Sequence, residues 1–283
     1  MTDLLAAATD LGAVTLDVAD LDAVTRFYAD GVGLDVLVGA AGVVELGRAG
    51  RTSVVLRHAP ALRHAPSGAA GLFHTAVLFE TRAALAAAVL GVATRYPAAF
   101  TGSSDHLVSA AFYFDDPEGN GVELYWDRPR TEWAWDGPQV RMGTLPLDPN
   151  AFLAEHLDRS APLAPAGASV GHVHLKVGDI PTARRFYVDT VGFEVTAAFG
   201  AQALFVAAGG YHHHLGMNTW ASGGAGPRTP ALGLGRVTMR LPHADDLAAL
   251  RDRLRAARVV VRDDGAGLSF EDPWSNAVHA ALA

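Results

Sequence analysis

Apolar and polar positions alternate along this chain in a unit that occurs four times. Each unit begins with a strand-like apolar segment, continues with a helical pattern, and ends in short apolar segments separated by polar or glycine-containing turns. In the second unit we expect the first strand at 74–79 and a helix at 82–96, with Thr81 as its N-cap. The pattern predicts four βαβββ modules, which start near residues 11, 71, 170 and 233.

The other predicted elements are mostly short strands. They lie at 36–38, 43–46, 53–57, 106–108, 110–114, 122–126, 195–199, 203–207, 212–217, 236–241, 259–262, 267–270 and 277–280, with a further helix at 245–257. We expect an N-terminal half (1–130) with modules 11–57 and 71–127, a linker (131–168) with a short helix at 148–157, and a C-terminal half (169–283) with modules 170–217 and 233–281.

An internal repeat supports this division. Residues 11–36 and 170–195 align without a gap, and twelve of the twenty-six pairs are identical, including an Arg-Phe-Tyr within the predicted helix. A second repeat relates the ends of modules two and four. There Asp-Asp-Pro-Glu-Gly-Asn-Gly-Val-Glu, ending at Glu123, matches Glu-Asp-Pro-Trp-Ser-Asn-Ala-Val-His, ending at His279. The carboxylate of one half is therefore replaced by an imidazole in the other.

Composition narrows the class of protein. The 283 residues are half hydrophobic and carry a net charge of -8 without a Lys/Arg cluster, so nucleic acid is not an expected partner. There is no cysteine, which excludes disulfides and thiolate zinc sites. No apolar run is long enough to span a membrane, and residues 1–13 lack the basic start of a signal peptide, so a cytoplasmic protein is expected. The chain contains twelve histidines but only one lysine.

Metal-ligating residue types fall at equivalent module positions. The four first strands place Ala13, His74, His172 and Arg236 at the same position, and the last strand of module two adds Glu123. A carboxylate in mid-strand is costly to bury unless a cation meets it. Taken singly, each histidine is more often a hydrogen-bonded core residue. Together, His74, His172 and Glu123 match the two-histidine, one-carboxylate set of non-haem iron(II) sites.

These motifs resemble the vicinal oxygen chelate superfamily, which includes glyoxalase I, bleomycin-resistance proteins and extradiol dioxygenases. The resemblance spans nearly the whole chain. It is most specific to the catechol-2,3-dioxygenase branch in three motifs: Asp-His-x-Val-Ser at 105–109, Asp-Arg-Pro at 127–129 and Gly-Gly-Tyr-His-His-His at 209–214. It implies an α+β fold in which the four βαβββ modules form two paired-module barrels. Because only modules two and three carry the ligand types, we expect these two to share one barrel, unlike the usual extradiol layout.

The resemblance also implies further site residues. Tyr113 and His106 lie upstream of the metal glutamate, as the acid–base groups of extradiol enzymes do, and His213 follows His172 at a comparable distance. If 212–217 is a strand, alternation places either His213 or the pair His212 and His214 on the cavity side. For Tyr113, a half-buried strand aromatic is an equally good interpretation. The histidine run could also be a polar loop.

The resemblance implies an extradiol ring-cleaving dioxygenase that uses Fe(II) and O₂ on a catechol-type aromatic diol. Mn(II) or Zn(II) would fit the same ligands. Two alternatives from other classes are a glyoxalase-type metal-dependent lyase or isomerase, which would normally have a second carboxylate where His172 stands, and a drug-sequestering binder, which needs no metal triad. The sequence leaves open the ring substituents and whether the chain forms a homo-oligomer.

Overall fold

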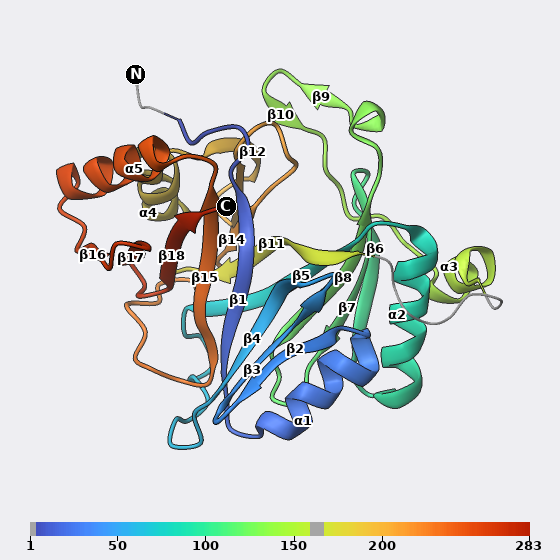
Figure 1. The fold of residues 1–283 in the computed structure, drawn as a ribbon. Helices are drawn as coiled ribbons and strands as arrows, with labels where there is room; N and C mark the ends of the chain where they lie inside the picture. The colour runs from blue at the N-terminus through green and yellow to red at the C-terminus, as the bar shows by residue number, and fades with distance from the viewer. Residues whose placement is uncertain (1–3, 159–166) are drawn as a thin grey trace.

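The computed structural model describes residues 4–158 and 167–283. Residues 1–3 and 159–166 lie outside the described residues, and the second of these segments belongs to the predicted linker 131–168. The fold is α+β and consists mainly of two curved eight-stranded sheets, here called sheet I and sheet II. In Figure 1 the strands of the two sheets run past each other near the centre of the molecule, and helices cover the outside.

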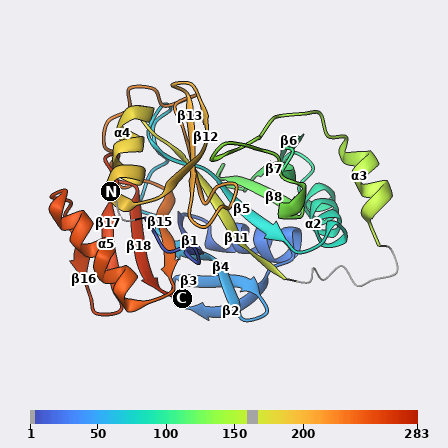
Figure 2. The ribbon, with the colours of Figure 1, turned by 90° about the horizontal axis from the view of Figure 1, so that it is seen from above.

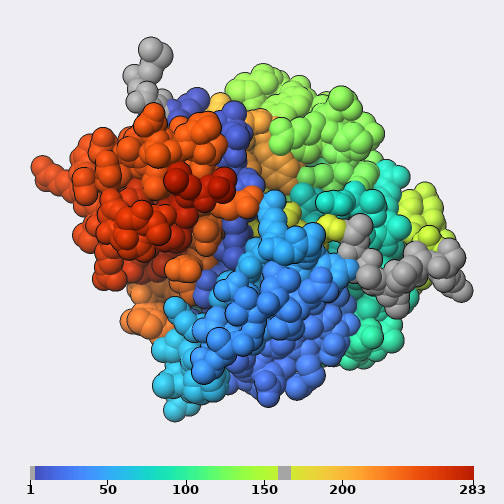
Figure 3. All heavy atoms as spheres, viewed as in Figure 1, coloured from blue at the N-terminus to red at the C-terminus, as the bar shows by residue number. Residues whose placement is uncertain are grey.

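Sheet I unites the first and fourth modules. Its strands, from one edge to the other, are β16 (Arg262–Asp263), β17 (Gly267–Glu271), β18 (Ala277–Leu282), β15 (Gly233–Leu241), β1 (Asp10–Val18), β4 (Arg51–His58), β3 (Val43–Arg48) and β2 (Asp35–Ala40). The antiparallel pair β1 and β15 joins the two modules at the centre. In the space-filling view of Figure 3, these two modules form much of the visible face, blue and orange-red.

Sheet II unites the second and third modules in the same way. Its strand order is β12 (Glu194–Phe199), β13 (Ala203–Ala207), β14 (Leu215–Asn218), β11 (Ala168–Lys176), β5 (Gly71–Phe79), β8 (Gly121–Asp127), β7 (Ser109–Asp115) and β6 (Phe100–Asp105). The central antiparallel pair is β5 and β11, and Figure 2 shows them side by side. The expected pairing of module two with module three is therefore confirmed at the level of the sheet.

The helices lie on the outside of the molecule (Figure 1). They are α1 (Leu21–Arg26), which continues as a π-helical segment at Phe27–Val32, α2 (Arg82–Arg95), α3 (Pro149–His156), α4 (Ile180–Arg184), which continues as a π-helical segment at Arg185–Val191, and α5 (Ala244–Ala256). Thr81 caps α2 by accepting a hydrogen bond from the backbone N–H of Ala84, as predicted. None of the described helices is long and apolar enough to cross a membrane.

The helix repeat ends the same way in both halves. Gly33 and Gly192 have φ values of 87° and 101°, in the left-handed region that favours glycine, and they reverse the chain after each π-helical segment. Between the modules, η2 (Arg130–Glu132), β9 (Trp135–Asp136) and β10 (Gln139–Val140) precede α3. The short helix expected in the linker at 148–157 is thus present as α3.

One predicted strand is wrong, and two others begin later than predicted. Residues 106–108 form a tight turn between β6 and β7, in which Leu107 has a φ of 72°. Residues 259–261 are a loop that leads into β16. The run 212–214 precedes β14 without strand structure, so strict alternation does not decide where its side chains point. Within the last run the backbone of His214 still pairs with both neighbours: its N–H donates to the carbonyl oxygen of Val206, and its carbonyl oxygen accepts from the N–H of Val173.

The Asp-Pro repeat forms two equivalent hydrogen-bonded loops. Asp116 accepts hydrogen bonds from the backbone N–H groups of Glu118 and Asn120 and from the Asn120 amide. Asp272 does the same for Trp274 and Asn276 and also accepts one from the hydroxyl of Tyr187, the tyrosine of the repeated Arg-Phe-Tyr. In the third and fourth modules this bond joins the helix of one module to the last loop of the next, whereas the hydroxyl of Tyr28, the equivalent tyrosine of the first module, is buried without a hydrogen-bond partner among the described residues.

We expect Asp272→Ala to lower the free energy of unfolding by about 3 kcal/mol or more, because it leaves several buried donors without an acceptor. Asp264→Ala is the matched control: Asp264 also caps a turn, but at an exposed position. Urea unfolding followed by fluorescence measures both. Equal losses in the two variants would show that the buried Asp272 loop contributes no special stability.

Candidate metal centre and its cavity

The inner face of sheet II brings the three candidate ligands together. Ala76 on β5 lies level with His172 on β11 and, on its other side, with Glu123 on β8. His74 lies two residues before Ala76 and therefore points to the same face. Because Ala76 has only a methyl group, the flanking imidazole and carboxylate can meet above it.

The three side chains converge on one point. Oε2 of Glu123 lies 3.0 Å from Nε2 of His74 and 3.1 Å from Nε2 of His172. One ligand atom from each residue lies within 4.8 Å of the other two, and all three residues are buried. A divalent ion with ligands at about 2.0–2.2 Å needs this separation. The predicted ligands thus occupy one place in the fold, in a geometry that could hold an ion.

The electrostatics favour the protonation states that ligands need. Burial opposes ionisation of Glu123, which is 2% exposed, but His172 and His74 hold the pKa of its carboxyl well below its usual range. Burial lowers the pKa of His172 to about 4, although Glu123 opposes this shift. A carboxylate and a neutral imidazole are the forms that bind a metal. The pair is therefore ready to coordinate at neutral pH.

The hydrogen bonding at this point is incomplete. Nε2 of His74 is buried and has no hydrogen-bond partner among the described residues, although it lies 3.0 Å from the Glu123 carboxylate. The two groups are close but not aligned for a hydrogen bond. Buried polar atoms are rarely left unsatisfied. His172 Nε2 is hydrogen-bonded to the Glu123 carboxylate at 3.1 Å, whereas His74 Nε2 is left without a partner beside it. A metal ion between the three groups would satisfy this orphaned nitrogen, so the donor set fits one.

A cavity of about 710 Å³ opens beside the three ligands. Aromatic rings form much of its wall, among them Phe73, Phe205 and Trp220. Other side chains that line it include Met142, Val108, Ser103, Ser104, Gln202 and Phe199. His174, two residues after His172 on β11, also faces the cavity and accepts a hydrogen bond from the Asn218 amide at its Nε2. It is adjacent to the ligand group but not part of it.

Tyr113 and His106 face the same cavity and contact each other. Tyr113 lies directly opposite Glu123 in the β7–β8 pairing. Nδ1 of His106 lies 2.7 Å from the carbonyl oxygen of Gly143, which can only accept, so His106 Nε2 is the acceptor for the Tyr113 hydroxyl at 2.6 Å. Burial, and then the Glu123 carboxylate, raise the pKa of Tyr113 well above its usual value. Its hydroxyl therefore stays protonated.

The three consecutive histidines have different environments. His213 lines the cavity, and its ring centroid lies 4.1 Å from that of His172. His212 is fully buried and does not line the cavity. His214 points away from it, accepts a hydrogen bond from the Ala208 backbone N–H and lies against the Tyr211 ring. Of the run, His213 is the member placed to meet a substrate.

One partner of this site, Asp127, was not among the residues predicted from the sequence. Asp127, at the end of β8, accepts hydrogen bonds from His212 and from the Tyr211 hydroxyl. The signal available was its position: residues 123, 125 and 127 share one strand face. In sheet I the equivalent positions hold Ala13, Arg236 and His279, and no metal-type cluster occurs there among the described residues.

Comparison with known proteins identifies relatives of the whole chain. Residues 169–279 match the profile of the Glyoxalase/Bleomycin resistance protein/Dioxygenase superfamily. The catechol-2,3-dioxygenase of Bacillus subtilis (strain 168) is 36% identical over 275 residues, which cover 95% of each chain. That likeness extends well beyond the C-terminal half that the profile matches.

Solved structures share the fold at low sequence identity. A candidate dioxygenase from Bacillus subtilis superposes with a TM-score of 0.68 at 13% identity, over 99% of this chain and 86% of that one. Glyoxalase I from Zea mays superposes with a TM-score of 0.58 at 13% identity, over 97% of this chain and 92% of that one. These two likenesses concern the fold alone.

We expect His74→Ala and Glu123→Gln each to weaken binding of Fe(II) or Co(II) by more than about 100-fold, because an open three-ligand site has no spare donor. The matched control is His279→Ala, which removes the imidazole at the position equivalent to Glu123 in sheet I. Anaerobic equilibrium dialysis with metal analysis measures the affinity. Undiminished binding by His74→Ala, or an equal loss in His279→Ala, would contradict the assignment.

Proposed function

The chain belongs to the glyoxalase/bleomycin resistance protein/dioxygenase superfamily, and from that premise we propose that it is an extradiol dioxygenase that cleaves a catechol-type ring with O₂. The observation that carries the proposal is the convergence of His74, His172 and Glu123 on one wall of a cavity that also holds an imidazole and a phenol. The 36% identity to a catechol-2,3-dioxygenase supports it.

The metal assigned to this site is Fe(II), with His74, His172 and Glu123 as its ligands. Two imidazoles and one carboxylate with open positions are the ligand set of non-haem Fe(II) oxygenases, although Mn(II) and Zn(II) fit the same donors. When bound, the metal would act as a Lewis acid toward the vicinal oxygens of the diol and provide a position for O₂. The chain itself supplies orientation, proton transfer and exclusion of water.

His213 is assigned as the acid–base residue. It lines the cavity next to His172, and a catechol that binds through both oxygens must release hydroxyl protons. Burial, followed by the neighbouring His172 and His212, lowers the pKa of His213 well below its usual value, so the ring is neutral before substrate binds. Tyr113 is assigned to hold a substrate oxygen: it faces the cavity, and its hydroxyl oxygen can accept from a diol hydroxyl while its own hydrogen is bonded to His106, which orients it.

The wall of the cavity supports an uncharged aromatic substrate. Phe73, Phe205 and Trp220 offer ring surfaces for a planar ligand. Among the described residues, no lysine or arginine lines the cavity, and the acidic Asp115 lies at its edge. A carboxylate on the ring would therefore be buried without a cation to pair with.

The direct test is ring cleavage by protein loaded with Fe(II) under anaerobic conditions and then mixed with catechol and oxygen. Extradiol cleavage gives a coloured ring-opened product, with one O₂ consumed per ring. Metal bound without product would refute the dioxygenase. Isomerisation of a thiohemiacetal would instead identify the glyoxalase-type alternative, whose fold this chain shares. Tight binding of an aromatic drug without metal or turnover would identify the binder.

We expect His213→Ala to retain its iron and bind catechol, but to turn it over about 10²–10⁴-fold more slowly, because a proton-transfer group is lost and no ligand is removed. His214→Gln is the matched control, because its amide oxygen can still accept the Ala208 hydrogen bond. Iron content and single-turnover rates are measured on both. If His213→Ala keeps the wild-type rate and His214→Gln loses activity, the assignment of the acid–base role to His213 is wrong.

Catechol and alkylcatechols should be cleaved with a kcat/KM more than about tenfold above that of 3,4-dihydroxybenzoate, because the cavity would bury the carboxylate of the latter unpaired. Gln202→Lys adds a cation to the cavity wall and should reduce the ratio of kcat/KM between catechol and 3,4-dihydroxybenzoate. Steady-state kinetics on both substrates measure the ratio. An equal or inverted preference in the wild type would show that the charged substituent points out of the cavity.

A further inference from the structure

Asp127 connects the surface of the protein to the acid–base histidine through two hydrogen bonds. Its Oδ1 lies 2.9 Å from Nε2 of His212, and Nδ1 of His212 lies 2.7 Å from Nδ1 of His213. The Asp127 side chain is 18% exposed, whereas His212 is fully buried. The three side chains thus form one chain of contacts that ends at the cavity.

Asp127 determines the direction of donation in these two hydrogen bonds. A carboxylate can only accept, so Nε2 of His212 must carry the hydrogen that it shares with Asp127. In a neutral imidazole the other nitrogen then has no hydrogen, so Nδ1 of His212 accepts. The donor in the next bond is consequently Nδ1–H of His213. By the same rule, Nε2 of His213 has a free lone pair.

That lone pair is available to the cavity. No hydrogen bond to Nε2 of His213 occurs among the described residues, and the ring lines the cavity beside His172. We propose that Asp127 is a positioning residue that fixes the tautomers of His212 and His213, so that an unprotonated Nε2 faces the bound substrate. The catalytic consequence rests on the proposed function, whereas the tautomers themselves do not.

The surroundings hold the Asp127 carboxylate in place. Its other oxygen accepts a hydrogen bond from the Tyr211 hydroxyl at 2.7 Å, and the Tyr125 hydroxyl lies 2.8 Å from that of Tyr211. Gly171 makes room for this arrangement, since a Cβ there would lie 1.8 Å from the Tyr125 hydroxyl oxygen. The carboxylate therefore accepts from two different directions, which fixes its orientation toward His212.

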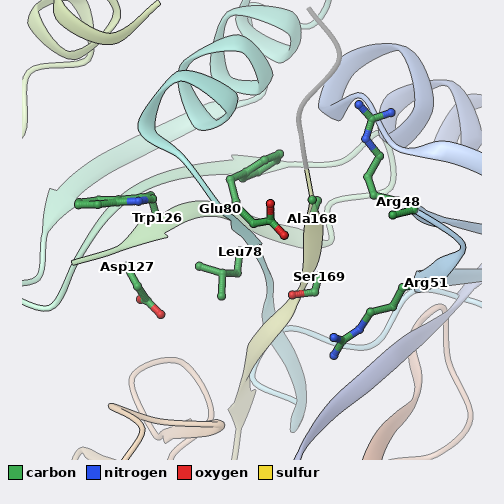
Figure 4. Close-up of a pocket in the computed structure, with 11 residues that line it drawn as sticks. Arg48, Arg51, Leu78, Glu80, Trp126, Asp127, Ala168 and Ser169 are labelled. Atoms are coloured by element: carbon green, nitrogen blue, oxygen red, sulfur yellow. The ribbon is translucent and has the colours of Figure 1, made fainter. Parts of the chain in front are cut away.

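Asp127 reaches solvent through a second pocket, separate from the substrate cavity. This pocket has a volume of about 420 Å³, and Arg48, Arg51, Glu80 and Trp126 also line it. Figure 4 shows Asp127 at its border, with the carboxylate pointing away from Glu80. The Asp127 side chain, 18% exposed, therefore has contact with solvent, whereas its partner His212 is buried.

The competing hypothesis is that the same histidine nitrogens bind a second metal ion. His172, His212 and His213 offer nitrogens within 4.8 Å of one another, so this cluster could in principle hold a second metal ion. In that case Nδ1 of His212 and His213 would carry no hydrogen. The hydrogen-bond length of 2.7 Å between these two nitrogens favours one shared hydrogen.

The first experiment reads the tautomers directly. Histidine ¹⁵N–¹H correlation spectra of the full chain loaded with diamagnetic Zn(II) should show His213 protonated at Nδ1 and unprotonated at Nε2, with His212 protonated at Nε2. In Asp127→Asn the amide can donate to His212, which should reverse both tautomers. Protonated Nε2 of His213 in the wild type, or two bound metal ions per chain with both Nδ1 atoms unprotonated, would overturn the proposal.

The second experiment measures the kinetic consequence. Asp127→Asn should keep its iron and its KM for catechol but lose about 10²–10⁴-fold in kcat, as expected when an imidazole is held in the wrong tautomer. Asp127→Glu should recover much of this loss, and Tyr211→Phe, which leaves the carboxylate as acceptor, should lose at most about tenfold. Equal losses in all three variants would indicate a merely structural role.

The two experiments separate the inference from the proposed function. If the wild type shows the expected tautomers but cleaves no catechol, the tautomer assignment stands and the dioxygenase fails. If it cleaves catechol with the opposite tautomers, or Asp127→Asn changes neither spectrum nor kcat, the dioxygenase stands and the positioning role of Asp127 is refuted. The wild-type spectrum decides the tautomers even if a variant fails to fold.

Discussion

A carboxylate buried in mid-strand is the constraint on which the site depends. Glu123 is almost fully enclosed, and the free energy cost of burying its charge must be met by groups in direct contact. The groups present are His74 and His172, whose Nε2 atoms both lie against the same oxygen. Two neutral imidazoles alone satisfy the carboxylate poorly, because one of the two contacts is not aligned as a hydrogen bond. A cation at the point where the three meet would satisfy all of them at once.

Comparing the two sheets separates the residues that maintain the fold from the residues that form the site. The buried aspartates of the Asp-Pro loops, Asp116 and Asp272, occur in both halves with the same set of backbone and asparagine donors. The ligand positions do not repeat: where sheet II has Glu123, sheet I has His279, which is half-buried and bonded to Ser269. Each sheet keeps the loop that fixes its last strand, but only sheet II has the chemistry to hold an ion among the described residues.

Features with local causes were predictable from the sequence, and those that depend on distant contacts were not. The Thr81 cap, the four modules and the strand faces of His74 and His172 follow from spacing alone. Residues 106–108 are predicted as a strand but form a turn, because a tight turn and a short strand can have similar composition. The run 212–214 resembled a strand because apolar residues flank it, but its histidines are satisfied by groups such as Asp127, about 85 residues earlier in the chain. The sequence places Asp127 on the same strand face as Glu123, but it does not indicate that His212 is its partner.

Two of the imidazoles that line the cavity outside the ligand group, those of His106 and His213, differ in how their tautomers are fixed. His106 donates to the Gly143 carbonyl oxygen, a backbone group that no side-chain substitution at that position removes. His213 depends instead on a side-chain carboxylate acting through a second imidazole. The first arrangement makes His106 a permanent acceptor toward the Tyr113 hydroxyl. The second can be reversed by a single change at Asp127 that alters neither the cavity wall nor the ligands. On the proposed assignment, the orientation of His213 is thus set from outside the cavity, whereas that of His106 is set by the backbone.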